Sequence, residues 1–153
     1  MNKFMALAIS EAEKGISNGE GGPFGSVIVK NGQIVGVGHN QVVKNNDPTC
    51  HGEMQAIRNA CKNLNSFDLS DCEIYTTGEP CPMCLAACMW ANIKKVYYGC
   101  TIDDNEAIGF RDKRFDTILN VNRKINEDFL EQVDREECLK LFEKYSKSNK
   151  TPY

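Results

Sequence analysis

The sequence predicts one α/β domain built on a mixed β-sheet, and three observations lead to this fold. Two apolar strand segments, residues 24–30 and 33–38, are joined by Asn31-Gly32, a strong two-residue hairpin signal. After the hairpin, segments with helical spacing alternate with short apolar strands. The chain of 153 residues fits one domain, and its 41% hydrophobic and 25% charged residues are typical of a globular protein.

The first part of the chain predicts a helix on each side of the hairpin. Apolar residues recur at helical spacing from Phe4 to Ile16, and Asn18-Gly19 ends this first helix. Residues 40–47 are mostly polar and predict a loop. A second helix is expected over about 51–64, since Pro48 favours a helix start and apolar residues follow at helical spacing.

The remaining elements follow the same alternation. Residues 73–77 predict a strand, residues 82–92 a helix and residues 95–98 a further strand, so the two strands are expected to be parallel. Residues 101–116 are predicted to be irregular or partly helical. Residues 129–145 have a helical pattern. The helices after the hairpin should begin at one edge of the sheet, which is where open α/β sheets bind ligands.

Composition narrows the classes of partner. The longest mainly apolar stretch, 85–93, is far shorter than the roughly 20 residues of a spanning helix, and the N-terminus lacks a secretion signal, so a cytoplasmic location is expected. A formal net charge of −3 argues against a nucleic-acid partner, because such proteins usually carry a basic face. A small-molecule substrate is therefore favoured.

Eight cysteines have to be explained in a reducing compartment. Only Cys81 and Cys84 form a C-x-x-C pair, which in the cytosol points to metal or redox chemistry rather than to a disulfide framework. The others are expected to be small buried hydrophobic residues. They are Cys50, Cys61, Cys72, Cys88, Cys100 and Cys138.

The chemistry centres on the segments His51-Gly52-Glu53 and Pro80-Cys81-Pro82-Met83-Cys84. Two thiolates three residues apart can converge on one metal at a helix N-terminus, where the unpaired amides and the dipole favour the thiolate form. His51 can supply a third ligand. Three protein ligands leave the fourth tetrahedral position of Zn²⁺ open for water, as catalytic zinc sites require.

Glu53 is expected to be a proton shuttle rather than a ligand. Successive helical residues turn by about 100°, so His51 and Glu53 can face one metal only from the first turn of a helix. Zinc lowers the pKa of a bound water toward about 7, and a nearby carboxylate can accept that proton and return it to a leaving amine.

These two segments resemble the H-x-E…P-C-x-x-C signature of the zinc-dependent cytidine and nucleobase deaminase family. Within it, the chain is similar to the bacterial guanine deaminases over almost its whole length. The resemblance implies a cytidine-deaminase-like three-layer α/β/α sandwich over residues 1–153, bound zinc, and hydrolysis of guanine to xanthine and ammonia. The matching segments are Gly21-Gly22-Pro23-Phe24-Gly25, Asn45-Asn46-Asp47-Pro48-Thr49, residues 79–85, Trp90-Ala91, Gly109-Phe110 with Asp112, and the terminal Tyr153.

The resemblance also implies roles for residues outside the metal site. Asn40 would hydrogen-bond the purine, Phe24 would pack on it, Asp112 would contact the base or shuttle protons, and Tyr153 in the tail 146–153 would close the pocket. Trp90 is expected to form a wall of the pocket or part of the core. The resemblance further implies a homodimer, with an exchanged C-terminus as one arrangement.

One departure and several alternatives accompany this hypothesis. Gly52 stands where the family usually has alanine, which weakens the helix by about 1 kcal/mol but removes no reactive group. A C-x-x-C pair at a helix start also fits a thiol redox site, and a zinc-binding interaction module would need a fourth ligand, such as His39. Asn40 could be only a turn residue and Asp112 only a solvated charge. Within the family, adenosine in transfer RNA, guanosine and cytosine are alternative substrates.

Overall fold

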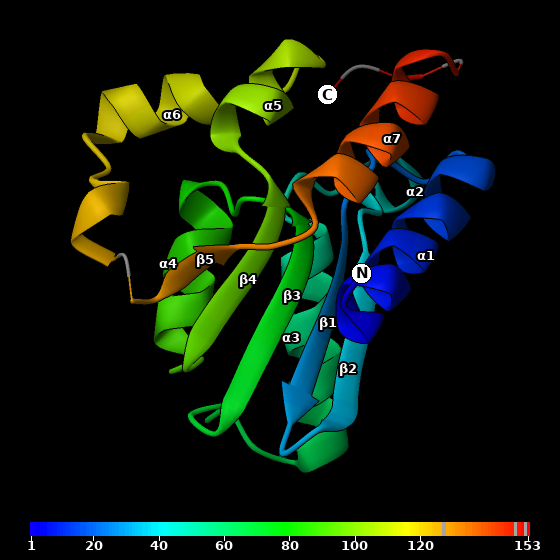
Figure 1. The fold of residues 1–153 in the computed structure, drawn as a ribbon. Coiled ribbons are helices and arrows are strands. Elements are labelled where there is room, and N and C mark those ends of the chain that lie inside the picture. Colours follow the sequence, from blue (N-terminus) through cyan, green and yellow to red (C-terminus); the bar gives the residue numbers. More distant parts are fainter. Residues whose placement is uncertain (127, 149, 152) are drawn as a thin grey trace.

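A mixed five-stranded sheet forms the centre of the computed structural model, which describes residues 1–126, 128–148, 150–151 and 153 (Figure 1). Its strands are β1 (Gly25–Lys30), β2 (Gln33–His39), β3 (Cys72–Gly78), β4 (Lys95–Cys100) and β5 (Leu130–Gln132). They lie in the order β2-β1-β3-β4-β5. β1 is antiparallel to both neighbours, and β4 is parallel to both of its own. The predicted parallel pairing of β3 and β4 is confirmed.

Helices cover both faces of this sheet and complete a three-layer α/β/α sandwich (Figure 1). α1 (Lys3–Ser17) and α7 (Arg135–Ser146) pack on one face, where their apolar side chains share a core cluster with β1 and β3. α3 (Gly52–Leu64) and α4 (Pro82–Trp90) pack on the other face over a second cluster. The expected fold class is confirmed.

The hairpin at the start of the sheet forms as its sequence predicts. Asn31 and Gly32 have positive φ angles of 50° and 76°, which a tight two-residue turn of this kind requires. Along β1, Val27 and Val29 face the first core cluster and Ile28 faces the second, because side chains alternate along a strand. Since helices cover both faces, this strand is apolar throughout its centre.

The segment 40–47 was predicted as a loop but contains the short helix α2 (Val42–Asn45). Contacts from distant residues hold its first turn. The backbone N–H groups of Val43 and Lys44 both donate to the Glu20 carbonyl at 3.1 Å, and that of Val42 donates to Asn40 Oδ1 at 3.1 Å. These acceptors satisfy amides that a short helix would otherwise leave unpaired.

The prediction of one helix over 129–145 is wrong at its start, where β5 forms the edge of the sheet. Val96 N–H donates to the Phe129 carbonyl at 2.8 Å and Val133 N–H to the Tyr98 carbonyl at 2.8 Å. The exposed edge of β4 thus supplies hydrogen bonds that a local helical turn would otherwise make, and α7 begins only at Arg135.

Residues 101–116 are partly helical, as expected, and residues 101–126 together continue the chain from the carboxyl end of β4 (Figure 1). They form α5 (Ile102–Ala107), α6 (Asp112–Leu119) and a 3₁₀ turn, Arg123–Asn126. Thr101 and Asp104 make a capping box at the start of α5. Among the described residues, none of the helices has the length and apolar character needed to cross a bilayer.

Candidate active site

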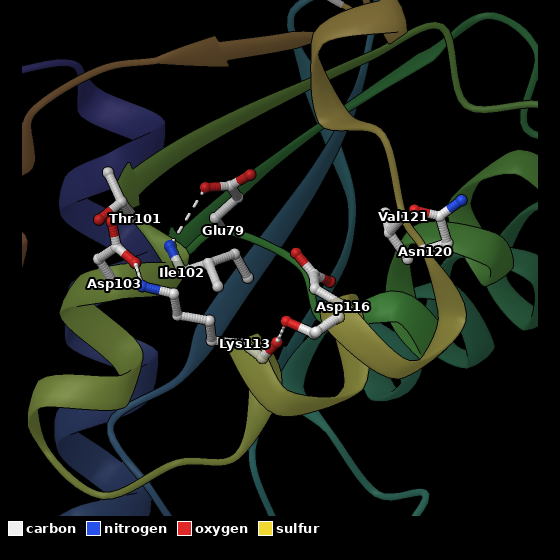
Figure 2. A pocket seen from close by; sticks show the side chains of 9 residues that line it. Glu79, Thr101, Ile102, Asp103, Lys113, Asp116, Asn120 and Val121 are labelled. Carbon is white, nitrogen blue, oxygen red and sulfur yellow. Dashed lines mark hydrogen bonds and ion pairs between the residues drawn. The ribbon is translucent and has the colours of Figure 1, made fainter.

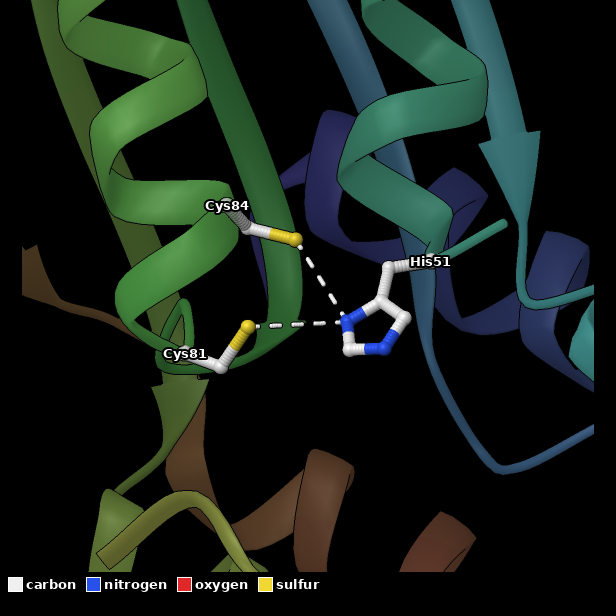
Figure 3. A group of neighbouring side chains, drawn as sticks. All are labelled: His51, Cys81 and Cys84. Atoms are coloured by element: carbon white, nitrogen blue, oxygen red, sulfur yellow. Dashed lines mark hydrogen bonds between the residues drawn. The ribbon is translucent and has the colours of Figure 1, made fainter. Parts of the chain in front are cut away.

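The three predicted metal ligands meet just beyond the carboxyl end of β3 (Figure 3). His51 is the N-cap of α3, Cys81 is the N-cap of α4, and Cys84 lies in the first turn of α4. His51 Nδ1 is 3.5 Å from Cys81 Sγ and 3.5 Å from Cys84 Sγ. The three ligand atoms all lie within 4.8 Å of one another. Two helix starts from distant parts of the chain therefore build one site.

The spacing of these atoms fits a zinc ion. Zn–N bonds of about 2.0 Å and Zn–S bonds of about 2.3 Å at a tetrahedral angle separate nitrogen from sulfur by about 3.5 Å, which agrees with the 3.5 Å observed. A hydrogen bond from Cys84, together with His51, lowers the pKa of Cys81 to about 4 despite burial, so Cys81 is a thiolate. Sulfur and imidazole donors suit zinc.

Glu53 lies in the first turn of α3 beside the ligands, in the position expected of a proton shuttle. Its side chain is buried, and burial, followed by the negative charge of Cys81, raises its pKa to about 7. A carboxyl group with this pKa can accept and release a proton near neutral pH.

Asp112, the first residue of α6, lines the same pocket. Burial and the Cys81 charge raise the pKa of Asp112 to about 6. Its Oδ2 accepts a hydrogen bond from Asn105 Nδ2 at 3.0 Å. Asp112 is therefore not a solvated surface charge. Burial raises the pKa values of three carboxyl groups of the pocket, those of Glu53, Asp112 and Glu79, and Glu79 is paired with Arg123.

Aromatic and amide side chains complete the pocket. Phe24 packs edge-on against Phe110, with ring centroids 4.8 Å apart. Asn40 is buried, and its Oδ1 caps α2, which leaves its Nδ2 as the group able to donate to a ligand. The Tyr153 hydroxyl accepts a hydrogen bond from Gly22 N–H at 3.1 Å, and its ring lies 5.3 Å from that of Phe110.

The family model for the cytidine and deoxycytidylate deaminase zinc-binding region matches residues 1–100 of the chain. This match covers α1 through β4 and includes all three ligands and Glu53. The chain belongs to this deaminase family. It is a zinc-dependent hydrolase, and the predicted zinc cofactor is confirmed.

Relatives and solved structures agree with this family. Guanine deaminase of Bacillus subtilis (strain 168) is 50% identical over 109 residues, covering 71% of this chain and 70% of that protein. The tRNA-specific adenosine deaminase of Aquifex aeolicus is 44% identical over 95 residues, 62% of each chain. The X-ray structure of guanine deaminase from Bacillus subtilis has a TM-score of 0.75 at 41% identity and covers 100% of this chain and 99% of that one. A crystal structure in complex with 2,6-diaminopurine has a TM-score of 0.83 at 26% identity, covering 98% and 83%.

Trp90 does not line the pocket of this deaminase, and the expectation for it is wrong. It is the last residue of α4, whose other end carries Cys81, and nine residues of helix span about 13 Å. Its side chain is 86% exposed, so it belongs to neither the pocket nor the core. The length of α4, which separates Trp90 from the ligands, explains the difference.

Two pocket residues of the deaminase, Glu79 and Phe110, were not singled out as site residues from the sequence. Each lies near a residue that was singled out. Glu79 is two positions before Cys81, and Phe110 is two positions before Asp112. Proximity in the sequence to a proposed catalytic residue is the signal that could have found them.

A second hollow, of about 400 Å³, lies next to the active site of the deaminase between α5 and α6 (Figure 2). Glu79 lines both hollows and links them. Its Oε1 accepts a hydrogen bond from Ile102 N–H at 3.2 Å, and its Oε2 accepts one from Arg123 Nη1 at 3.2 Å. Arg123 also makes a two-pronged contact with Asp116, at 2.6 and 2.7 Å. This hollow is larger than the active-site pocket, but its acidic side chains are already paired and it contains none of the metal ligands.

The alternatives to a catalytic zinc site are not supported. In the described part of the chain, His51, Cys81 and Cys84 form the group able to hold a metal, and no fourth protein ligand joins them. His39 contacts Glu11 and Glu20 instead. Both imidazole nitrogens of His39 are thus engaged away from the sulfurs. The eight cysteines are free, and the six outside the C-x-x-C pair are buried or half-buried, as predicted.

Proposed function

We propose that the enzyme hydrolyses guanine to xanthine and ammonia. The observation that carries this proposal is the pair of carboxyl groups, Glu53 and Asp112, with pKa values raised to about 7 and about 6 beside the zinc ligands. Two proton carriers suit a reaction that both activates water and releases an amine. The 50% identity to a guanine deaminase supports the choice of base.

The zinc ion held by His51, Cys81 and Cys84 would supply Lewis-acid activation of a water molecule. Glu53 accepts a proton from the attacking water and returns it to the amino group that leaves as ammonia. Asp112 assists by contacting the base or by carrying a second proton near that amino group. The pKa values of about 7 for Glu53 and about 6 for Asp112 let both carboxyl groups exchange protons near neutral pH.

Substrate contacts come from the rest of the pocket. Asn40 Nδ2 donates to a carbonyl or ring nitrogen of the purine, since Asn40 Oδ1 is occupied by the amide of Val42. Phe24 packs on the base. Tyr153 covers the pocket mouth, anchored on Gly22 and Phe110. A closed mouth favours a free base over a polymer.

A homodimer in the cytoplasm completes the proposal. Met89 and Trp90 at the end of α4 are 44% and 86% exposed, and Ala86 and Asn92 complete a hollow with them. An exposed aromatic residue with apolar neighbours is typical of a protein interface. Tyr153 lines the pocket of its own chain, and an exchanged C-terminus would bring the same side chain to the partner's pocket.

Adenosine in transfer RNA is the second candidate substrate, supported by the 44% identity to an adenosine deaminase that acts on tRNA. The acidic net charge of −3 argues against it, because an RNA partner needs basic contacts. Guanosine and cytosine are further members of the same reaction class.

An ammonia-release assay tests the substrate. Guanine, guanosine, adenine, cytosine and a transfer-RNA anticodon stem are compared at equal concentration with one zinc per chain, and kcat/KM is measured for each. Guanine is expected to be preferred by at least about 100-fold, because buried hydrogen-bond groups discriminate strongly against bases that leave them unpaired. Equal or faster turnover of the RNA stem would overturn the proposed substrate.

A further inference from the structure

Asn105 is a fully buried polar residue in α5 that the proposed mechanism does not use. Its Nδ2 donates to Asp112 Oδ2 at 3.0 Å and to the Glu79 carbonyl at 3.2 Å. Its backbone carbonyl accepts Phe110 N–H at 3.1 Å. Asn105 therefore bonds three segments of the pocket wall at once: the turn before Cys81, the residue Phe110, and the side chain of Asp112.

The orientation of the Asn105 amide is fixed by its surroundings. Both groups facing Nδ2 are acceptors, so a flipped amide would turn Oδ1 toward a carboxylate and a carbonyl. The opposite atom, Oδ1, is buried and finds no hydrogen-bond partner among the described residues. Oδ1 lies next to Gly78, and a Cβ atom added to that glycine would be only 2.9 Å from Oδ1.

An unsatisfied buried carbonyl oxygen disfavours folding, and an apolar side chain of the same shape would avoid it. Leucine matches asparagine in branching and in number of side-chain heavy atoms, although it is larger, and it carries no polar atom. The carbonyl half of the amide is therefore costly for stability, whereas its Nδ2 half makes two hydrogen bonds. A polar group kept at such a cost is expected where function needs its donor.

We infer that Asn105 is a positioning residue of the reaction, which holds the Asp112 carboxylate toward the pocket through its Nδ2–H donor. This inference rests on the proposed role of Asp112. Among the described residues, Asn105 is the one side chain that hydrogen-bonds this carboxylate. Arg123 is paired with Glu79 and Asp116 instead.

Arg123 and Asn105 contact different residues of α6. The Arg123 clamp fixes the helix through Asp116, one turn after Asp112. Arg123 makes its hydrogen bonds to Asp116 and Glu79, and none of them reaches the side chain of Asp112. Asn105 supplies the bond that selects one rotamer, and misplacement of a reacting group by about 1 Å can slow a reaction by about 100-fold.

The test compares Asn105→Leu, Asp112→Asn and the double variant in zinc content, melting temperature, kcat and KM. Asn105→Leu is expected to keep its zinc and to stay folded with a melting temperature at or somewhat below that of wild type, because it removes the unpaired Oδ1 but also the Nδ2 donor to Asp112 and Glu79. Its kcat should fall by about 10- to 100-fold with KM changed less than about threefold. In the Asp112→Asn background, Asn105→Leu should slow kcat by less than about twofold further, because the carboxylate that Asn105 positions is already gone.

Thr101→Ala is the matched control. It removes the capping box of α5 and so loosens the same helix without touching the Asn105 amide. It should lower the melting temperature while kcat stays within about twofold of wild type. If Asn105→Leu does not fold, Asn105→Ala is measured in the same cycle.

Three results would overturn the inference: a kcat of Asn105→Leu equal to wild type, losses in the double variant that multiply, or an equal loss of kcat in Thr101→Ala. A wild-type enzyme that releases no ammonia from guanine would instead refute the proposed substrate. The cycle is then run on the base that the enzyme does turn over, so the two failures are distinguishable.

Discussion

The two histidines of the chain lie in clusters that differ in their partners. His51 faces two sulfur atoms, each 3.5 Å from its Nδ1, and Glu53 lies beside it. His39, at the end of β2, lies between two carboxylates: Glu11 is 3.1 Å from its Nδ1, and Glu20 contacts its Nε2. Both histidines have an acidic neighbour, but only His51 can turn a lone pair toward a metal with soft ligands.

The His39 cluster ties elements together instead of doing chemistry. Glu11 also pairs with Lys14 at 2.9 Å, and Glu20 with Lys44 at 2.8 Å. These contacts join α1, β2, α2 and the loop before β1, next to the wall that carries Asn40. The comparison teaches that the type of neighbouring atom, sulfur or carboxylate oxygen, separates a metal ligand from a structural histidine.

The largest expected effect comes from exchanging each histidine for alanine. His51→Ala should lose most of its zinc and more than about 10³-fold of kcat/KM, because two thiolates alone do not complete the site. His39→Ala should keep one zinc per chain but lose about 2 kcal/mol of unfolding free energy, since two buried carboxylates lose a hydrogen-bond partner.

Metal analysis, ammonia release and urea unfolding are measured on both variants. Zinc lost from His39→Ala with the fold intact would contradict the division between the two clusters. Full activity of His51→Ala would also contradict this division, because the zinc site would then not need His51.

A smaller effect is expected from the acidic neighbours of the two histidines. Glu53→Gln should retain zinc and fold stability while kcat falls by about 10²- to 10⁴-fold, because the proton carrier is lost. Glu20→Gln is the matched change in the other cluster, and it should lower stability while leaving kcat nearly unchanged. Turnover by Glu53→Gln at the wild-type rate would remove this glutamate from the mechanism.

The smallest effect is a pH dependence of stability that arises from the His39 cluster. Burial alone would raise the pKa of Glu11 and Glu20, but hydrogen bonds and charges from their lysines and His39 outweigh it and lower the pKa of each below 4.5. A lowered pKa in the folded state stabilises the protein above the unfolded pKa, and this stability is lost as the pH falls through the folded value.

The double variant Glu11→Gln/Glu20→Gln should therefore be less stable at pH 7, by less than about 1 kcal/mol for each pair, and its stability should fall less steeply below pH 4.5. Urea unfolding at pH 7 and at pH 3.5 measures the difference. An equal loss of unfolding free energy between pH 7 and pH 3.5 in the wild type and the double variant would show that the cluster does not contribute to the pH dependence of stability.

Short-range patterns in the sequence predicted most of the fold and the centre of the site. Asn31-Gly32 defines the hairpin because both residues accept a positive φ. The ligands could be named because C-x-x-C places two sulfurs at one helix start, where their own backbone amides favour thiolate. These features depend on residues a few positions apart, so the chemistry is readable without the fold.

Features that depend on distant contacts emerged from the folded chain. α2 forms on the Glu20 carbonyl, and β5 pairs with the free edge of β4 instead of starting a helix. Trp90 is exposed because α4 ends away from the pocket, and Asn105 reaches Asp112 only once α5 and α6 pack together. Each outcome depends on which hydrogen-bond partner or apolar surface is near in space, and such proximity has no signature in local spacing.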